Sequence, residues 1–241
     1  MYPSFYTGYL GAKANLQNLD VIGNNLANVN NGAFKPKTAV FQSLLQYNLN
    51  DSEDAVTELQ TGNGVRVQGT YTSFAAAAPT NTNSALDFAI MKDNTFFRVV
   101  DPATGAVSYT RDGHFHRGQI GNNFYLMTDN NKYVIGRDGR PIVLQGGEAD
   151  GEGLSERLAF FTFSNPSRLM SAGNNEYVTQ EGMTPIVVNE RAAAQGYLES
   201  SGTDLVKEMA RLIESQRAYT YALKMVQTSD EIVGTINTLK G

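Results

Sequence analysis

The sequence predicts an α+β fold with a helix at each end and a mostly antiparallel β domain between them. Both ends carry apolar residues at alternating steps of four and three, which is the spacing of coiled coils, while the middle carries short alternating strands separated by Asp-Gly pairs. We therefore expect three parts: a coiled-coil-like helical domain (1–34 and 200–241), a connecting segment with β-strands (35–78 and 185–199), and a central β domain (79–184).

The C-terminal helix is expected to run from Thr203, as its N-cap, to Leu239, with Asp204 placing negative charge in the first turn. Its only glycine is Gly234 and it contains no proline. A helix of that length extends roughly 55 Å, so its seam needs a partner, either elsewhere in the chain or in another copy. The predicted seam is Leu205, Met209, Leu212, Gln216, Tyr219, Leu223, Val226, Asp230 and Val233.

The N-terminal helix shows the same period. Pro3 suits the first helical position, and Gly32 and Pro36 indicate that the helix has ended before them. Its predicted seam is Phe5, Tyr9, Ala12, Leu16, Leu19, Gly23 and Leu26. The end of this helix is rich in asparagine, with five in the eight residues 24–31. Asparagine tolerates left-handed backbone and bonds to its own backbone, so we expect a helix end followed by a turn.

The middle of the chain is predicted to form β-strands. Residues 65–71 alternate, and the compositional break at 75–83 suggests a domain boundary. The following apolar runs are short and aromatic, at 86–90, 97–99, 160–163 and 186–188. Three Asp-Gly pairs are hairpin-type turn signals: Asp112-Gly113, Asp138-Gly139 and Asp150-Gly151.

Composition excludes several classes of function. The net charge is −5, and the 19 basic residues form no run, so no nucleic-acid partner is expected. The chain has no cysteine, which rules out disulfides and thiolate metal sites. Its first residues lack the features of a cleavable secretion signal, and no apolar run approaches the roughly 20 residues of a membrane span. We expect any export to leave the N-terminus intact.

No residues are nominated for catalysis, cofactor binding or metal binding. His114 and His116 would share one face of a strand, but a zinc site normally needs a third protein ligand. The acidic loop with Glu148, Asp150 and Glu152 lacks the EF-hand spacing. The sequence contains no nucleophile elbow, P-loop or dinucleotide fingerprint. We expect no cofactor, no small-molecule substrate and no enzymatic activity.

Three segments carry a resemblance to a known family. Asn24-Asn25-Leu26-Ala27-Asn28-Val29-Asn30 precedes Phe34-Lys35 near the N-terminus, and Tyr109-Thr110-Arg111-Asp112-Gly113 lies in the middle. Gly196-Tyr197-Leu198-Glu199 leads to Glu208-Met209 and then to Gln216-Arg217-Ala218-Tyr219. Together they resemble the flagellar rod and hook family of axial proteins.

The resemblance implies a structural subunit of the bacterial flagellar basal body. It implies export through the flagellar type III apparatus without signal cleavage, and assembly into a helical tube with copies of itself and with other rod and hook proteins. The short β domain favours a rod over a hook protein. Gly62-Asn63-Gly64-Val65 and the C-terminal helix resemble the distal rod type more than the proximal one. The expected self-assembly residues are Leu16, Leu19, Asn24, Asn25, Leu26, Asn28, Leu205, Met209, Leu212, Gln216, Tyr219, Leu223 and Val226.

Two hypotheses from other classes remain open at this point. In one, the β domain between Leu86 and Val188 binds a ligand and the terminal helices only form a closed dimer. In the other, the carboxylates of Glu148, Asp150 and Glu152 act on cell-wall glycan. A rod subunit elongates, whereas a dimeric binding module does not.

Overall fold

The computed structural model describes residues 3–48, 60–144 and 153–239. It contains helices at both ends of the chain and antiparallel strands between them, so the predicted α+β class is confirmed. The chain forms two compact units. The helical unit comprises Met1–Ala27, Lys37–Tyr71 and Asp204–Gly241, and the β unit comprises Asn28–Pro36 and Thr72–Thr203. The three-part division and the coiled-coil character stay predictions.

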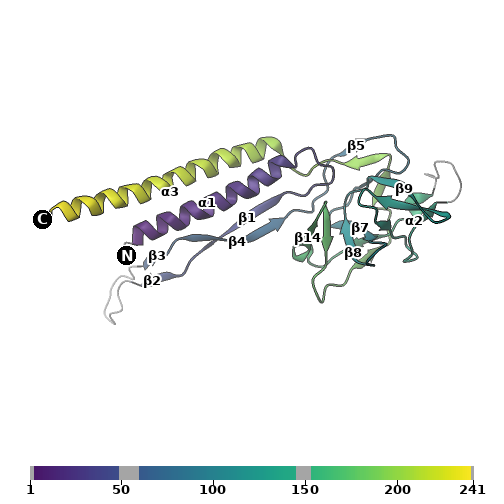
Figure 1. Cartoon of the computed structure of the whole chain (residues 1–241), viewed down its shortest axis with the longest axis horizontal. Coiled ribbons are helices and arrows are strands. Elements are labelled where there is room, and N and C mark those ends of the chain that lie inside the picture. The colour runs from purple at the N-terminus through teal and green to yellow at the C-terminus, as the bar shows by residue number, and fades with distance from the viewer. Residues whose placement is uncertain (1–2, 49–59, 145–152, 240–241) are drawn as a thin grey trace. The chain divides into compact units, whose positions relative to one another are not determined.

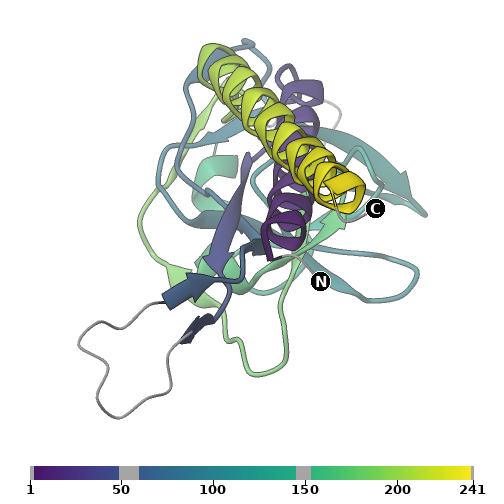
Figure 2. The same cartoon turned by 90° about the vertical axis from the view of Figure 1, so that its left-hand side faces the viewer.

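The helical unit is built on two long helices, α1 (Pro3–Ala27) and α3 (Leu205–Leu239). They lie side by side and run in opposite directions (Figures 1 and 2). Strand β1 (Lys37–Ser43) pairs with β4 (Val65–Thr72), and β2 (Gln46–Asn48) pairs antiparallel with β3 (Gln60–Gly62). Within the described residues, neither long helix is apolar enough to cross a membrane.

Helix α3 begins one residue later than the sequence predicted. The side-chain Oδ1 of Asp204 accepts hydrogen bonds from the backbone N–H groups of Val206 (3.0 Å) and Lys207 (3.1 Å). The carbonyl of Asp204 also accepts the first helical bond, from the N–H of Glu208 at 2.9 Å. These are the bonds of an N-cap residue, so the prediction of Thr203 as the cap was wrong. A carboxylate also interacts more favourably with the helix dipole than a hydroxyl does.

The β unit contains a ten-stranded sheet whose described pairings are antiparallel. Its central strand is β7, which pairs with β8, β11 and β13 and buries both of its faces, as expected for its apolar sequence. The strands are β7 (Thr95–Val100), β8 (Val107–Thr110), β9 (Phe115–Ile120), β10 (Asn123–Thr128), β11 (Tyr133–Val134), β12 (Val143–Leu144), β13 (Phe160–Thr162), β14 (Met170–Gly173), β15 (Glu176–Val178) and β16 (Ile186–Val188).

Two short strand pairs and two short helices complete the β unit. Strand β5 (Pro79–Asn81) pairs with β18 (Tyr197–Glu199), and β6 (Phe88–Ile90) pairs with β17 (Ala193–Gln195). The helices are α2 (Leu154–Arg157) and a 3₁₀ turn, η1 (Pro166–Arg168). The predicted strands at 86–90, 97–99, 160–163 and 186–188 are thus confirmed.

Aromatic side chains hold much of the core of the β unit. One apolar cluster includes Phe88, Phe97, Phe115 and Phe160, and a second includes Phe96 and Tyr177. Phe97 meets Phe115 edge-on with ring centroids 5.1 Å apart, an arrangement that adds about 0.5–1.5 kcal/mol beyond area burial. The aromatic runs seen in the sequence therefore became core strands.

The three Asp-Gly pairs were predicted to form hairpin turns, and the structure differs among them. Asp138-Gly139 lies in a tight turn, with Gly139 at φ +75°, between the bridged residues Ile135 and Pro141. The prediction of a hairpin at Asp112-Gly113 was wrong. The strands on either side of this pair, β8 and β9, do not pair with each other: β8 pairs with β7 and β15, and β9 pairs with β10. Glycine at 113 instead permits a close backbone approach, since a Cβ there would lie 1.7 Å from the Phe88 carbonyl oxygen. The third pair, Asp150-Gly151, lies outside the described residues.

A buried ionic cluster ties distant segments of the β unit together. The Lys35 ammonium lies 2.7 Å from Oε1 of Glu199, and the Arg111 guanidinium donates to both Glu199 oxygens at 3.0 Å. All three side chains are fully buried. Burial, reinforced by the neighbouring Arg111 charge, lowers the pKa of Lys35. Because Lys35 follows α1 in the sequence and Glu199 precedes α3, the cluster joins the two chain segments that flank the long helices.

Candidate assembly surface

The contact between α1 and α3 is made by small and polar residues. A Cβ at Gly8 would lie 2.9 Å from Cγ2 of Val226, and a Cβ at Gly11 would lie 3.7 Å from the Ala222 Cβ. Near the N-terminus of α1, the Ser229 hydroxyl lies 3.3 Å from the Ser4 hydroxyl. Glycine lets two helix backbones approach closely, so this end of the pair packs tightly without large apolar side chains.

Further along the pair, hydrogen bonds replace apolar packing. The Asn18 amide donates to Oγ of Ser215 at 3.2 Å, and that hydroxyl donates to the Asn15 carbonyl at 3.2 Å. The Asn25 amide donates to Oε2 of Glu208, also at 3.2 Å. Asn25, Glu208 and Ser215 are buried. Polar groups inside a helix pair fix its register at some cost in stability.

Asn25 also anchors α1 to the neighbouring strand. Its side-chain amide donates to the Lys37 carbonyl at 2.7 Å and its Oδ1 accepts from the Lys37 N–H at 2.9 Å. The partner carboxylate, Glu208, accepts a further bond from Arg211 at 2.9 Å. The asparagine side chain is thus satisfied within the chain, and this explains why an amide occupies a fully buried position.

These contacts form a defined stripe on each helix, which we call the contact stripe. On α1 the contacting residues are Ser4, Gly8, Gly11, Asn15, Asn18 and Asn25, and on α3 they are Glu208, Ser215, Ala222, Val226 and Ser229. The buried Ile22 and the half-buried Leu212 and Tyr219 continue the same spacing, and we count them with the stripe. Both stripes step by three and four. The contact stripe of α1 lies one residue N-terminal to the predicted apolar seam at every position.

On α1, the offset of one residue places the contact stripe about 100° around the helix from the predicted seam. On α3, Leu212, Tyr219 and Val226 belong to both the predicted seam and the contact stripe, whereas Met209 and Leu223 lie one residue beyond it. The predicted seam contains the most apolar residues and leaves out Gly8, Gly11, Asn15, Asn18, Glu208 and Ser215. Their own regular three-and-four spacing was the signal available for finding them.

The predicted self-assembly residues fall into three groups. Only Asn25 is buried within the chain. The half-buried group is Leu19, Leu26, Asn28, Leu212, Tyr219 and Val226. The exposed group is Leu16, Asn24, Leu205, Met209, Gln216 and Leu223.

Five exposed apolar residues of the two helices lie on the same side of the pair. In an antiparallel pair, the residue that follows a contact position is rotated by about 100° from it, and on both helices this rotation leads to the same side of the pair. Phe5, Tyr9 and Leu16 follow the α1 contact stripe by one residue, and Met209 and Leu223 follow the α3 stripe in the same way. We call this set the forward face. It forms an apolar surface that no described segment of the chain covers.

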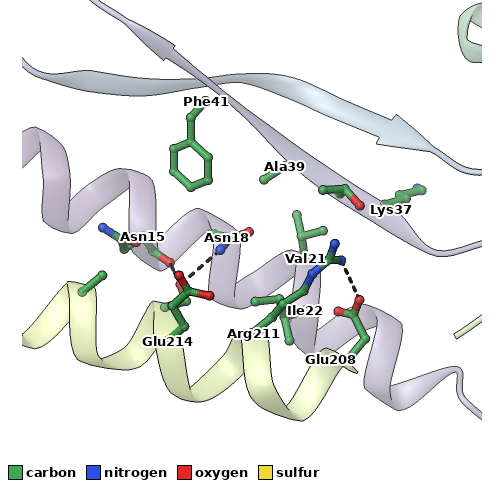
Figure 3. A pocket seen from close by; sticks show the side chains of 13 residues that line it. Asn15, Asn18, Val21, Ile22, Lys37, Ala39, Phe41, Glu208, Arg211 and Glu214 are labelled. Carbon is green, nitrogen blue, oxygen red and sulfur yellow. Dashed lines mark hydrogen bonds and ion pairs between the residues drawn. The ribbon is translucent and has the colours of Figure 1, made fainter. Parts of the chain in front are cut away.

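A groove lies between α1, α3 and β1 in the helical unit (Figure 3). Its cavity volume is about 290 Å³, with Phe41 and Ala39 of β1 opposite Asn18 and Arg211 of the helices. The dashed Arg211–Glu208 pair lines one end. The lining combines amides, hydroxyls, charged groups and a few apolar side chains.

The other sequence candidates offer no reactive centre among the described residues. The backbone N–H of His114 donates a hydrogen bond to Oδ1 of Asp112 at 3.0 Å. His116 lies on β9, and its Nδ1 is 3.8 Å from Oδ1 of Asp129. In the described parts of the chain, no three His, Asp or Glu residues gather as a metal site would require. Glu148, Asp150 and Glu152 lie outside the described residues.

The two helices that form the contact stripes lie in the segments that match family models. Residues 5–33 match the family described as flagella basal body rod protein, and residues 194–239 match the C-terminal family of the flagellar basal body rod proteins FlgE, FlgF and FlgG. The paired ends therefore place the chain in the class of flagellar axial proteins.

Full-length relatives define the family. The chain is 32% identical to the flagellar basal-body rod protein FlgG of Buchnera aphidicola subsp. Schizaphis graminum, covering 99% of this chain and 100% of the relative. It is 29% identical to FlgG of Bacillus subtilis over the whole of both chains, and 28% identical to FlgF of Mesorhizobium japonicum over 99% of each. The chain belongs to the family of flagellar basal-body rod proteins.

Family membership fixes the general role. The protein is a structural, non-enzymatic subunit of the flagellar basal body, where it assembles with other rod and hook components. The hypothesis of a glycan-cleaving enzyme is therefore wrong. The predicted recognition of a rod protein is confirmed, along with the absence of catalysis.

Proposed function

We propose that this protein is a distal-type rod subunit that self-assembles into a helical tube through the apolar faces of its terminal helices. The observation that carries the proposal is the forward face. Leu16 is 48% exposed, Met209 52% and Leu223 39%, although all three occupy coiled-coil spacing. An apolar helical face gains most of its stability when it is buried, so ordering of the helices and assembly support each other.

The polar contact stripe supports the same proposal. Buried polar groups such as Asn25 and Glu208 specify how α1 meets α3 but contribute less stability than apolar packing would. Such a pair keeps its register while leaving the apolar residues for neighbouring subunits. The terminal helices would then form a coiled-coil-like layer only within the assembly.

The distal type is supported by the full-length relatives named FlgG. A relative named FlgF also aligns over the full chain, so a proximal rod type is the alternative within the family. Export through the flagellar type III apparatus and direct contacts with adjacent rod and hook subunits belong to the same proposal.

The test places charge on the forward face. Met209→Asp combined with Leu223→Asp should abolish concentration-dependent elongation, measured by light scattering and negative-stain electron microscopy, because the carboxylates would be desolvated at the subunit contact. The control moves each substitution by one residue, to Ala210→Asp with Lys224→Asp, both exposed on the outer side of α3. Loss of elongation only in the first variant supports the proposal.

Two outcomes would contradict it. Unchanged elongation by the Met209 and Leu223 variant would show that the forward face is not an assembly surface. A wild-type chain that stops at a closed dimer would favour the alternative in which the β unit binds a ligand and the helices only dimerise it.

A further inference from the structure

Two segments of the β unit continue directly into the long helices. Residues 28–36 follow α1, and residues 199–203 end just before Asp204, the N-cap of α3. The two segments are bonded to each other. The hydroxyl of Ser201 donates to the carbonyl of Asn28 at 3.0 Å, across 173 residues of sequence. We call the two segments together the collar.

The collar is closed by backbone hydrogen bonds and by a close contact. The N–H of Ala33 donates to the Glu199 carbonyl at 2.8 Å, and the N–H of Gly202 donates to the Phe34 carbonyl at 2.9 Å. A Cβ at Gly202 would lie 3.0 Å from Cδ of Pro36. The two backbones therefore fit together at a point where a side chain would crowd a rigid proline ring.

The buried ionic cluster fixes the collar to the rest of the β unit. Lys35 comes from one collar segment and Glu199 from the other, and both side chains are fully buried. The Lys35 ammonium also donates to the Ala75 carbonyl at 2.6 Å, and the Glu199 carboxylate accepts from Arg111, which follows β8. Opening the collar would leave buried charge unpaired, which is strongly unfavourable. The collar therefore stays closed wherever the β unit is folded.

The closed collar shortens the connection between the two helices. The contact between α1 and α3 consists largely of small and polar groups, so it gains little from apolar burial and depends on how often the helices meet. Shortening the connection from 173 residues to about ten favours pairing roughly 70-fold, because the probability of loop closure falls with the 3/2 power of its length.

We propose that the folded β unit is a template for the helical unit. The collar brings the end of α1 to the start of α3, and pairing of the helices proceeds from Asn25 and Glu208 towards Ser4 and Ser229. The β unit then has a role within every subunit that is independent of contacts between copies.

A disulfide equilibrium measures this pairing within a single chain. The chain has no cysteine, and the hydroxyls of Ser4 and Ser229 lie 3.3 Å apart at the other end of the contact stripe. Ser4→Cys with Ser229→Cys therefore introduces two thiols that reach each other when the helices pair. Equilibration with reduced and oxidised glutathione, at a protein concentration where the chain is monomeric, gives the effective concentration of one thiol at the other.

The first variant opens the collar in this background. Gly202→Val places a branched side chain against Pro36, and the effective concentration should fall at least about 10-fold as the connection lengthens. Gly32→Ala is the matched control within the collar. A Cβ at Gly32 would lie 3.5 Å from the Glu199 carbonyl oxygen, an ordinary contact, so the effective concentration should not change.

The second variant keeps the collar closed and lengthens the connection beyond it. An insertion of about 20 Gly and Ser residues between Thr203 and Asp204 should lower the effective concentration roughly fivefold. The same insertion between Glu181 and Gly182, in an exposed turn of the β unit, is the control and should leave it unchanged.

Hydrogen exchange of β7 and β13 establishes that the sheet stays folded in each variant. Equal effective concentrations for the two insertions would overturn the proposal, and so would helices that pair no better in the parent chain than in urea. If Gly202→Val also unfolds β7, the insertion after Thr203 decides the outcome, because it leaves every collar residue in place.

Discussion

Lys35 and Glu199 form a fully buried ion pair, with Nζ and Oε1 2.7 Å apart. The two residues are separated by most of the chain, yet each lies next to one of the long helices in sequence. Glu199 also accepts two bonds from Arg111 and one from the backbone N–H of Ala77. A single carboxylate therefore pairs with two buried cations and links three segments of the β unit to its own strand.

We predict that Glu199→Gln strongly destabilises the β unit. Removing one partner of a buried ion pair leaves uncompensated charge, which typically costs about 3–5 kcal/mol. The free energy of unfolding, measured by urea titration with tyrosine fluorescence, should fall by that amount. Glu190→Gln is the matched control, because Glu190 pairs with Lys92 at the same 2.7 Å but with both side chains exposed. Equal unfolding midpoints for the two variants would contradict the prediction.

We predict that the buried phenol of Tyr177 makes the β unit sensitive to alkali. Burial raises the pKa of Tyr177 to about 12 from a model-peptide value of 10.0. Between these two values the folded state keeps the proton that the unfolded state loses, so stability is full below pH 10 and declines as the pH rises towards 12. The limiting slope is about 1.4 kcal/mol per pH unit.

The measurement compares the wild type with Tyr177→Phe by urea unfolding across that pH range. The wild type should lose stability more steeply, since phenylalanine has no proton to release. Other tyrosines titrate in both proteins and cancel in the difference. Parallel pH profiles would show that Tyr177 is readily ionised in the folded state.

Much of the fold could be predicted because its signals are local. Long stretches free of proline mark α1 and α3, and aromatic alternation marks strands such as β7 and β13. The asparagine-rich turn after α1 is also confirmed, with the Asn31 N–H bonded to the Asn28 carbonyl at 3.2 Å. These features depend on residues that are close together in sequence.

The packing of the helices could not be predicted in the same way. Apolar periodicity identifies the stripe that avoids water, but it does not say whether that stripe meets the same chain or another one. Here the intrachain contact uses Gly8, Asn18 and Ser215, which a hydrophobic pattern ignores. The Lys35–Glu199 pair was missed for a related reason, because charged residues are usually exposed and these two lie far apart in sequence.

We predict that Asn25→Ala weakens the helical unit while Gln17→Ala does not. Asn25 is fully buried and bonds both backbone groups of Lys37 as well as Glu208. Its loss leaves buried polar groups unsatisfied, at about 1–3 kcal/mol. Gln17 is an exposed amide on the same helix. Thermal unfolding followed by far-UV circular dichroism should separate the two variants, and equal melting curves would mean that water replaces the lost bonds.

We predict that alanine stabilises the helical unit at one glycine of the contact stripe and not at the other. Alanine favours a helix over glycine by about 0.5–1 kcal/mol. At Gly11 the new Cβ would meet the Ala222 Cβ at 3.7 Å, an ordinary contact, so Gly11→Ala should stabilise the helical unit. At Gly8 it would lie 2.9 Å from Cγ2 of the stiff, β-branched Val226, so α1 and α3 must shift apart and the gain is lost.

Urea unfolding followed by far-UV circular dichroism measures both variants against the wild type. The double substitution Gly8→Ala with Val226→Ala removes the clash and should recover part of the helix-propensity gain, which separates steric crowding from a backbone requirement at residue 8. If Gly8→Ala alone stabilises the protein as much as Gly11→Ala does, the close approach of α1 and α3 at this point is not a constraint on the fold.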